Sequence, residues 1–304
     1  MTNHAAKASY HSASPDSMVR CRICHSASPK LLYKVPLERP LGQIHSLEIL
    51  RCLDCGLVFS GVELGEKALA SLYSNGYYES EDSVMSVDRN IVSERSRRTL
   101  DRLQKLELEG KELLDVGCGC GQFIKLAESK GWQCHGLDIS PWAAQVASEQ
   151  AGVPVFVGTL AEACYPSETF DVVTAWDVIE HIIEPQAFVA EVRRILKLGG
   201  MLVVRTPNQN SLFHLLAGLS SRAGWSYPLQ QIYHVDHLSY FTGSTLESLL
   251  YRENFRIETV EYEDITIHDT RFRGWQKAAI AIIHLIARVL KKHHAMIVFA
   301  RAVP

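Results

Sequence analysis

The chain has 304 residues, a formal net charge of −3 at neutral pH and a hydrophobic content of 47%. This length is sufficient for a full hydrophobic core, and for one large domain with a small one beside it. The charge argues against a dedicated nucleic-acid-binding protein. No segment is long and apolar enough to cross a bilayer.

The first 18 residues are rich in Ala, Ser and His and contain no apolar run. They predict a disordered tail over residues 1–18, because a secretory signal peptide would need an apolar core. We therefore expect a cytoplasmic protein.

Two Cys-x-x-Cys pairs follow the tail: Cys21 with Cys24, and Cys52 with Cys55. Four thiolates of this kind complete a closed tetrahedral zinc site, which leaves no position open for a substrate. We therefore expect structural Zn²⁺ in a zinc-ribbon module over residues 19–60, a segment too short to build its own core. A redox pair, disulfides, or ligation by His25 or His45 are the alternatives.

Residues 61–110 are expected to connect this module to the next domain. Ala68–Tyr78 predicts a short helix and an aromatic loop that carries Tyr73, Tyr77 and Tyr78. Apolar residues at helical spacing from Ile91 to Leu108 predict an amphipathic helix.

A glycine-rich loop follows the predicted strand Glu112–Val116, with glycines at Gly117, Gly119 and Gly121. Glycine lets the backbone approach a ligand closely or adopt a positive φ. The helix that begins near Gln122 directs its N-terminal amides toward the loop. Asp138 ends the next strand about 20 residues later, where a carboxylate can accept hydrogen bonds from two ribose hydroxyls. The pattern predicts a site for an adenosine-containing cofactor.

The glycine spacing helps to identify that cofactor. A dinucleotide fingerprint requires G-x-G-x-x-G, and here Gln122 stands at the third glycine position. Asp115, just before the loop, would repel a pyrophosphate but suit an ammonium group. A pyrophosphate-binding turn is therefore disfavoured.

The rest of the chain alternates predicted strands with helices. The expected strands are Gln133–Asp138, Pro154–Val157, Phe170–Trp176, Met201–Arg205, Phe255–Tyr262 and Met296–Arg301. Such alternation predicts an α/β domain with parallel strands and helices on both faces. Ser244 and Glu247 are spaced as a capping box, which predicts a helix over Leu246–Arg252.

Three of these stretches, Leu113–Ser140, Phe170–Ile182 and Leu196–Asn208, resemble the motifs of class I S-adenosylmethionine-dependent methyltransferases. The resemblance implies a Rossmann-like, seven-stranded sheet whose last strand is antiparallel, in a methyltransferase domain over residues 111–304. It implies S-adenosylmethionine as the cofactor, and it implies that the aromatic loop before the domain can lie over that cofactor.

The same resemblance implies which residues hold the cofactor: Asp115, Gly117, Cys118, Gly119, Gly121, Asp138, Ile139, Thr159 and Asp177. Asp115 is expected near the methionine ammonium group, Asp138 at the ribose and Ile139 on the adenine. Thr159 stands at the adenine edge, where many family members have an acidic residue. Asp177 is expected at the methionine end, with a helix-capping role as the alternative.

Transfer of a methyl group to oxygen requires a base, and histidine suits that role near neutral pH. His181, in the segment expected beside the transferred methyl group, is the first candidate. His234 and His237, in Tyr233–Phe241, are the others. Packing roles are the alternatives for all three.

A helical insertion is expected near residues 265–294, with a helix over Trp275–Lys292. One face is apolar, with Ala279, Ile282, Ile283, Ile286, Val289 and Leu290, and the opposite face has Lys277, His284, Arg288 and Lys291. The helix is expected either to cover the active site or a partner subunit, or to make a peripheral contact with an anionic membrane.

The sequence thus predicts a methyltransferase that acts on oxygen or carbon of a small molecule, or of a glycan or secondary-metabolite precursor. One alternative is an RNA methyltransferase, because basic residues of the zinc ribbon could bind RNA, although Tyr33 and Phe59 are the only aromatic residues there. The other is a cofactor-binding scaffold without catalysis.

Overall fold

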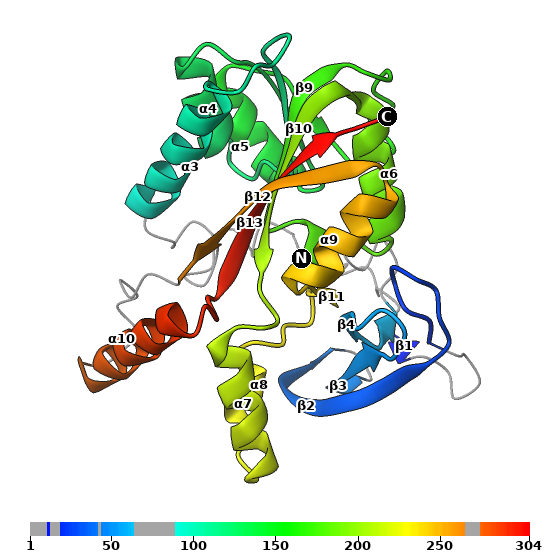
Figure 1. Ribbon diagram of the computed structural model, residues 1–304, viewed down its shortest axis with the longest axis vertical. Helices are drawn as coiled ribbons and strands as arrows, with labels where there is room; N and C mark the ends of the chain where they lie inside the picture. The colour runs from blue at the N-terminus through cyan, green and yellow to red at the C-terminus, as the bar shows by residue number, and fades with distance from the viewer. Residues whose placement is uncertain (1–10, 13–18, 42–43, 64–88, 265–273) are drawn as a thin grey trace, which may run out of the picture.

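A computed structural model describes residues 11–12, 19–41, 44–63, 89–264 and 274–304. Figure 1 shows a large sheet with helices on both sides, and below it a smaller sheet formed mainly by the N-terminal part of the chain. The expected helix and aromatic loop over Ala68–Tyr78 lie outside the described residues, as does most of the expected N-terminal tail.

The large sheet has seven strands in the order β12-β13-β10-β9-β6-β7-β8. Its strands, in chain order, are β6 (Glu112–Val116), β7 (Gln133–Asp138), β8 (Val155–Val157), β9 (Phe170–Trp176), β10 (Leu196–Pro207), β12 (Phe255–Glu263) and β13 (Ala295–Ala302). The pairs among β6 to β10 are parallel, whereas β13 runs antiparallel to both of its neighbours. The Rossmann-like sheet with a final antiparallel strand is therefore confirmed.

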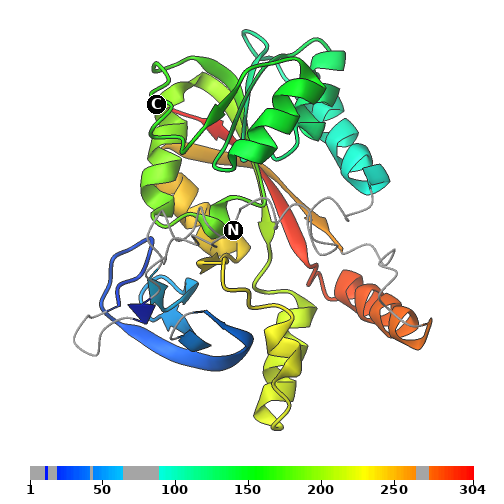
Figure 2. The ribbon, with the colours of Figure 1, turned by 180° about the vertical axis from the view of Figure 1, so that it is seen from behind.

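The two faces of this sheet are covered by two separate layers of helices, shown in Figures 1 and 2. The helices are α3 (Arg89–Leu103), α4 (Gln122–Ser129), α5 (Pro141–Ala151), α6 (Pro185–Ile195) and α9 (Gly243–Arg252). Leu113 and Val172 pack in one core cluster with residues of α3, α4 and α5. Leu114 and Val173 pack in the other cluster with residues of α6 and α9. Successive side chains alternate between faces, as strand geometry requires.

The start of α9 differs from the sequence prediction. The helix begins at Gly243, and its N-cap is Thr242 rather than Ser244. The Thr242 hydroxyl accepts a hydrogen bond from the Thr245 amide at 3.1 Å, and the Thr245 hydroxyl accepts one from the Thr242 amide at 2.9 Å. The predicted Ser244–Glu247 box is wrong because these two threonines already satisfy the amides that a cap must serve.

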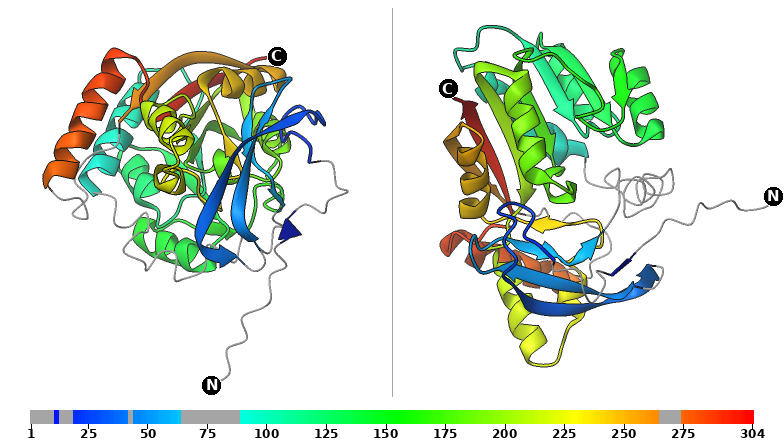
Figure 3. Two further views of the ribbon diagram at one scale, coloured as in Figure 1. Left: turned by 90° about the horizontal axis from the view of Figure 1, so that it is seen from below. Right: turned by 90° about the vertical axis from the view of Figure 1, so that its right-hand side faces the viewer.

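The small sheet has the order β11-β4-β3-β2. Its strands are β2 (Pro29–Leu41), β3 (Ile44–Cys52), β4 (Val58–Ser60) and β11 (Ser239–Tyr240), and β1 (His11–Ser12) pairs separately with β5 (Val62–Glu63). β11 comes from the second half of the chain and pairs antiparallel with β4. The expected domain boundary near residue 60 is thus bridged in space by a strand of the large domain, as the right-hand view of Figure 3 also shows.

Further contacts join the small sheet to the large domain. Cys21, Cys52 and Phe59 belong to the same buried cluster as Phe241 and Leu246. The remaining helices are α7 (Leu212–Arg222), α8 (Tyr227–Gln230) and α10 (Gly274–Val289), with a short 3-10 helix, η2 (Ile179–His181). α8 packs against β2, so part of the late chain covers the N-terminal sheet.

Candidate functional site

The four cysteines of the paired motifs meet at one point. The Sγ atoms of Cys21 and Cys55 are 3.4 Å apart, those of Cys24 and Cys52 are 3.5 Å apart, and all four lie within 4.8 Å of one another. A tetrahedral zinc ion with Zn–S bonds of about 2.3 Å separates its sulfurs by about 3.8 Å. The thiols are not joined as disulfides. The four-cysteine cluster therefore fits a zinc ion, and neither His25 nor His45 belongs to it.

Local backbone geometry explains why both pairs form tight turns. The His25 amide donates to the Cys21 carbonyl at 3.0 Å, and the Gly56 amide donates to the Cys52 carbonyl at 3.1 Å. Gly56 has a φ of 80°, a left-handed conformation that glycine adopts without strain. Each turn brings the two sulfurs of its pair to one side.

The glycine loop lies at the carboxyl ends of the parallel strands, where ligands bind in open α/β sheets. Gly117 has a φ of 67°, and a Cβ there would lie 2.5 Å from the Val178 side chain. Gly121 has a φ of 77°, and a Cβ there would lie 2.9 Å from the Cβ of Ala147 in α5. These two glycines set the path of the loop and bring the start of α4 against α5.

Asp138 is connected directly to this loop. Its Oδ2 accepts a hydrogen bond from the Gly119 amide at 2.9 Å, and its Oδ1 accepts one from the Ser140 amide at 2.8 Å. At Gly119 itself a Cβ would meet nothing within 4 Å, so the loop is open at that position. The carboxylate and an open turn of backbone thus stand side by side, as an adenosine ribose requires.

Asp115 is buried beneath the loop, with 1% of its surface exposed. Its Oδ1 accepts a hydrogen bond of 2.6 Å from the Thr174 hydroxyl. Burial raises the pKa of this carboxyl to about 7, against an opposing effect of the Thr174 bond, and the charge of Asp138 raises it further. A cationic group near Asp115 would stabilise the ionised form.

The other expected contacts to the cofactor surround the same edge. Ile139 is half-buried directly after Asp138, and the buried Cys118 side chain lies against Gly136 of β7. Thr159 donates from both its amide and its hydroxyl to the Glu162 carboxylate, at 2.7 Å and 2.9 Å. Glu162 therefore places an acidic group directly beside Thr159, three residues later in the chain.

Asp177 follows β9 in a left-handed conformation, with a φ of 54°. It forms an ion pair with Arg205, which also pairs with Glu263 at 3.2 Å. Burial opposes ionisation of Asp177, but the charges of Arg205 and Arg95 outweigh it and hold its pKa below the usual value. The 3-10 helix that follows has Val178 as its N-cap and no side-chain cap, so the structure does not show a capping role for Asp177.

The three candidate histidines lie in one group. The ring centroids of His181 and His237 are 4.7 Å apart, and those of His234 and His237 are 5.3 Å apart. His234 is exposed, whereas His181 and His237 are half-buried. Burial lowers the pKa of His237 to about 3, and the charge of His181 acts in the same direction. His237 is therefore neutral at pH 7.

Asp236 orients His181 in this group, and the sequence did not single it out. The His181 Nδ1 lies 2.9 Å from the Asp236 carbonyl oxygen and 3.7 Å from its carboxylate. A carbonyl can only accept, so Nδ1 carries the hydrogen and the imidazole is in the tautomer whose Nε2 accepts a proton. Burial disfavours the charged Asp236, but His237, His181 and His234 outweigh it and lower its pKa.

Glu180 completes the inner side of the histidine group. It is 1% exposed, and one carboxyl oxygen accepts a hydrogen bond from Thr206 at 2.9 Å. Its Oε1 is buried without a hydrogen-bond partner. Burial and the charge of Asp177 raise its pKa well above the usual value, so the neutral carboxyl is favoured.

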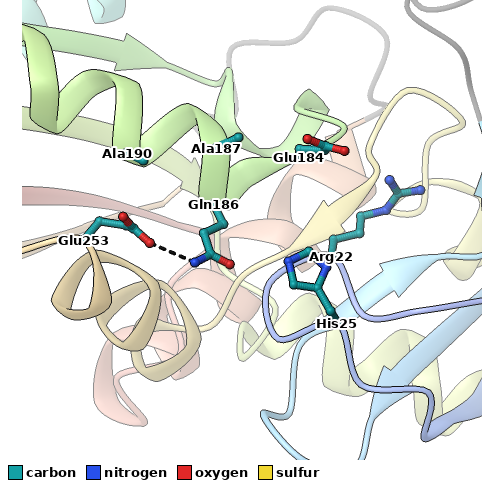
Figure 4. Close-up of a pocket in the computed structure, with 7 residues that line it drawn as sticks. All are labelled: Arg22, His25, Glu184, Gln186, Ala187, Ala190 and Glu253. Atoms are coloured by element: carbon teal, nitrogen blue, oxygen red, sulfur yellow. Dashed lines mark hydrogen bonds between the residues drawn. The ribbon is translucent and has the colours of Figure 1, made fainter.

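A separate hollow of about 350 Å³ lies where the N-terminal module meets α6 and α9 (Figure 4). Gln186 donates to Glu253 across it at 2.9 Å, and His25 stands at its module side. Arg22 reaches past it to donate to the carbonyls of Ile183 and Val62. The hollow is a junction between the two parts of the chain, and none of its lining residues belongs to the glycine loop.

A family model described as "Methyltransferase domain" matches residues 89–260, more than half of the chain. The chain belongs to the class I S-adenosylmethionine-dependent methyltransferase family. The match begins at the first residue of α3 and ends in β12, so it includes the glycine loop, Asp138 and the histidine group.

Several known proteins are similar to this methyltransferase. A "Ubiquinone biosynthesis O-methyltransferase" of Paraburkholderia xenovorans is 33% identical over 175 residues, 54% of this chain and 73% of that protein. One of the same name from Cereibacter sphaeroides is 37% identical over 110 residues, and the chain spans only 44% of its length. The crystal structure of a SAM-dependent methyltransferase from Archaeoglobus fulgidus has a TM-score of 0.51 at 20% identity, covering 70% of this chain and 94% of that one.

Proposed function

We propose that the protein transfers the methyl group of S-adenosylmethionine to an oxygen atom of a small molecule. The observation that carries the proposal is the pairing of His181 with Asp236 beside the carboxyl end of β9. An imidazole held in this tautomer is suited to take the proton of a hydroxyl nucleophile. The name of the O-methyltransferase relatives supports oxygen, and carbon of a small molecule or of a glycan or secondary-metabolite precursor is the second candidate.

The cofactor would be held by residues of the glycine edge. S-adenosylmethionine would supply an electrophilic methyl group, bonded to its sulfonium sulfur. Asp138 and the open turn at Gly119 would hold the ribose, and the buried Asp115 would face the ammonium group. Ile139 and Thr159, with Glu162, would bound the adenine, and Asp177 would close the methionine end. Alignment by these groups, rather than covalent chemistry, would lower the barrier.

The four-cysteine cluster would hold Zn²⁺ in a structural role. Its sulfurs complete a closed shell, and two of the cysteines are buried in the core that the module shares with α9. The ion would therefore stabilise the junction between the small sheet and the large domain.

Two features of the small sheet argue against RNA as the acceptor. Phe59 is fully buried, and the Tyr33 ring packs on that of Tyr233 at a centroid distance of 5.8 Å. Neither aromatic side chain is therefore placed to stack on an exposed base. Arg22, one of the basic residues of the module, donates to backbone carbonyls within the protein.

The proposal is tested by incubating the purified protein with methyl-labelled S-adenosylmethionine and small-molecule extract, and identifying labelled products by mass spectrometry. We expect an O-methylated product. His181→Ala should lower the rate about 100-fold, within the usual range for loss of a general base, without changing cofactor affinity. Asp236→Asn, which keeps the carbonyl but loses the charge, should lower it less.

His45→Ala is the matched control, because that histidine is exposed on β3 and is not part of the histidine group. Asp138→Ala should abolish cofactor binding and transfer together. Labelled nitrogen or carbon products, or an unchanged rate for His181→Ala, would refute the assigned base. Cofactor binding with no label transferred to any acceptor would identify a scaffold instead.

A further inference from the structure

The helices α7 and α10 expose most of the large apolar side chains at one end of the molecule. On α7 and the segment after it these are Leu215, Leu216, Leu219, Trp225 and Tyr227, and on α10 and just beyond it they are Ile282, Leu285, Ile286, Val289 and Leu290. Both helices reach the same end, below the large sheet in Figures 1 and 2. An apolar patch of this kind usually marks an interaction site. We call these ten residues the α7–α10 surface.

The two helices are in contact with each other. Phe213 of α7 packs edge-on against His284 of α10, with ring centroids 5.4 Å apart, and against His294 at 5.8 Å. His284 and Ala287 form the buried side of α10, with 6% and 1% of their surfaces exposed. His284 is thus buried, whereas Arg288, expected on the same face of the helix, is exposed. The side of α10 that carries His284 and Ala287 contacts the rest of the protein, and the apolar residues of the α7–α10 surface are exposed.

The two stretches of chain that carry the α7–α10 surface contain basic residues and no acidic ones. Residues 209–235 and 270–294 contain no Asp or Glu, although the whole chain has a net charge of −3. The basic residues whose side chains the structure describes there are Arg222, Arg288, Lys291 and Lys292. Arg288 pairs with Asp264 at 2.9 Å, yet 67% of its side chain remains exposed.

We propose that the α7–α10 surface docks on an anionic lipid bilayer. An exposed apolar helix face bordered by cations, with a Trp and a Tyr beside it, is the composition of a helix that lies in the membrane interface. Anionic headgroups supply the negative charge that both stretches lack. A second copy of the chain fits less well, because a two-fold interface would bring the cations of one copy toward those of the other.

The contact is peripheral. α10 has 16 residues, so it is about 24 Å long, shorter than the hydrocarbon core of about 30 Å. None of the described helices meets the length and hydropathy of a membrane span. The inference does not depend on methyl transfer, because lipid binding can be measured without an acceptor or a cofactor.

The test is co-sedimentation of the full-length protein with vesicles of phosphatidylethanolamine and phosphatidylglycerol, and with vesicles of phosphatidylcholine alone. We expect binding to the anionic vesicles that weakens as salt is added. Leu285→Glu/Val289→Glu should reduce the bound fraction more than about tenfold, because two apolar side chains can no longer enter the interface. Tyr251→Glu is the matched control, since Tyr251 is 78% exposed and Val289 is 77% exposed.

Thermal unfolding of both variants checks that each is folded, and we expect both to fold because the replaced side chains are exposed. Binding lost in the α10 variant and kept in Tyr251→Glu supports the proposal. Absence of binding to anionic vesicles, or equal binding to phosphatidylcholine, overturns it. A dimer in solution that the α10 variant dissociates also overturns it, by showing that a second copy covers the surface.

Discussion

Gly121 gives the sharpest test of how the glycine loop is built. Its φ of 77° is left-handed, and a Cβ there would lie 2.9 Å from the Cβ and 3.0 Å from the Cα of Ala147. Gly152, at the end of α5, has nearly the same φ of 75°, but a Cβ there would meet nothing within 4 Å. Alanine at either position should therefore cause a similar amount of backbone strain, but only at Gly121 would its methyl group also be crowded by a neighbouring residue.

The expected magnitudes follow from these two contributions. Gly152→Ala should lower the free energy of unfolding by about 1–2 kcal/mol, the cost of a left-handed alanine. Gly121→Ala should lose that amount and about 1–3 kcal/mol more, because α4 and α5 must separate to admit the methyl group. The larger loss should be accompanied by weaker binding of S-adenosylhomocysteine, since the amides at the start of α4 move with the helix.

Urea-induced unfolding, followed by circular dichroism, measures the two free energies, and isothermal titration calorimetry measures the affinity. Equal losses of stability in the two variants would refute the packing argument. Normal cofactor affinity in a destabilised Gly121→Ala protein would show that α4 does not help to form the cofactor site.

Two further predictions concern the remaining parts of the site. Burial raises the pKa of Asp115 to about 7, so the affinity for S-adenosylhomocysteine should be constant above that pH and fall by up to tenfold per pH unit below it, because the ammonium group must displace the proton that the carboxyl takes up. Calorimetry across this pH range measures the affinity, and Asp115→Asn should remove its pH dependence. A pH-independent affinity of the wild-type protein would contradict the assignment. Removal of zinc by a chelator should lower the midpoint of thermal unfolding, because Cys21 and Cys52 share a core with Phe241 and Leu246. Metal analysis should find one zinc ion per chain. An unchanged midpoint after complete removal of zinc would argue against a structural ion.

The sequence predicted three of the parallel strands to the residue, whereas β10 extends beyond the predicted Met201–Arg205 at both ends. The bounds of β6, β7 and β9 agree with the prediction, because buried parallel strands are short apolar runs that end at glycine or at a carboxylate. The paired Cys-x-x-Cys motifs likewise predicted the four-cysteine cluster, since the spacing within each pair fixes two sulfurs locally.

Contacts between distant segments were not predictable in this way. β11 has only two residues and pairs with β4, so nothing local distinguishes it from a loop. Glu162 beside Thr159 was missed because the acidic group stands three residues from the position where the family pattern expects it. Asp236 was missed because its carbonyl and carboxylate matter only once the 233–241 segment lies against η2.

The sequence by itself determined the fold, the position of the cofactor loop and the four thiols, because each depends on periodicity or on spacing within a few residues. The tertiary structure alone decided the orientation of α10 and the surroundings of the histidines. A helical pattern shows that a face is apolar, but it does not show which face is buried, and in the structure the side of α10 with His284 and Ala287 packs against the core. Which side is buried depends on contacts with distant residues such as Phe213 of α7, about 70 residues earlier in the chain, whose ring packs against His284.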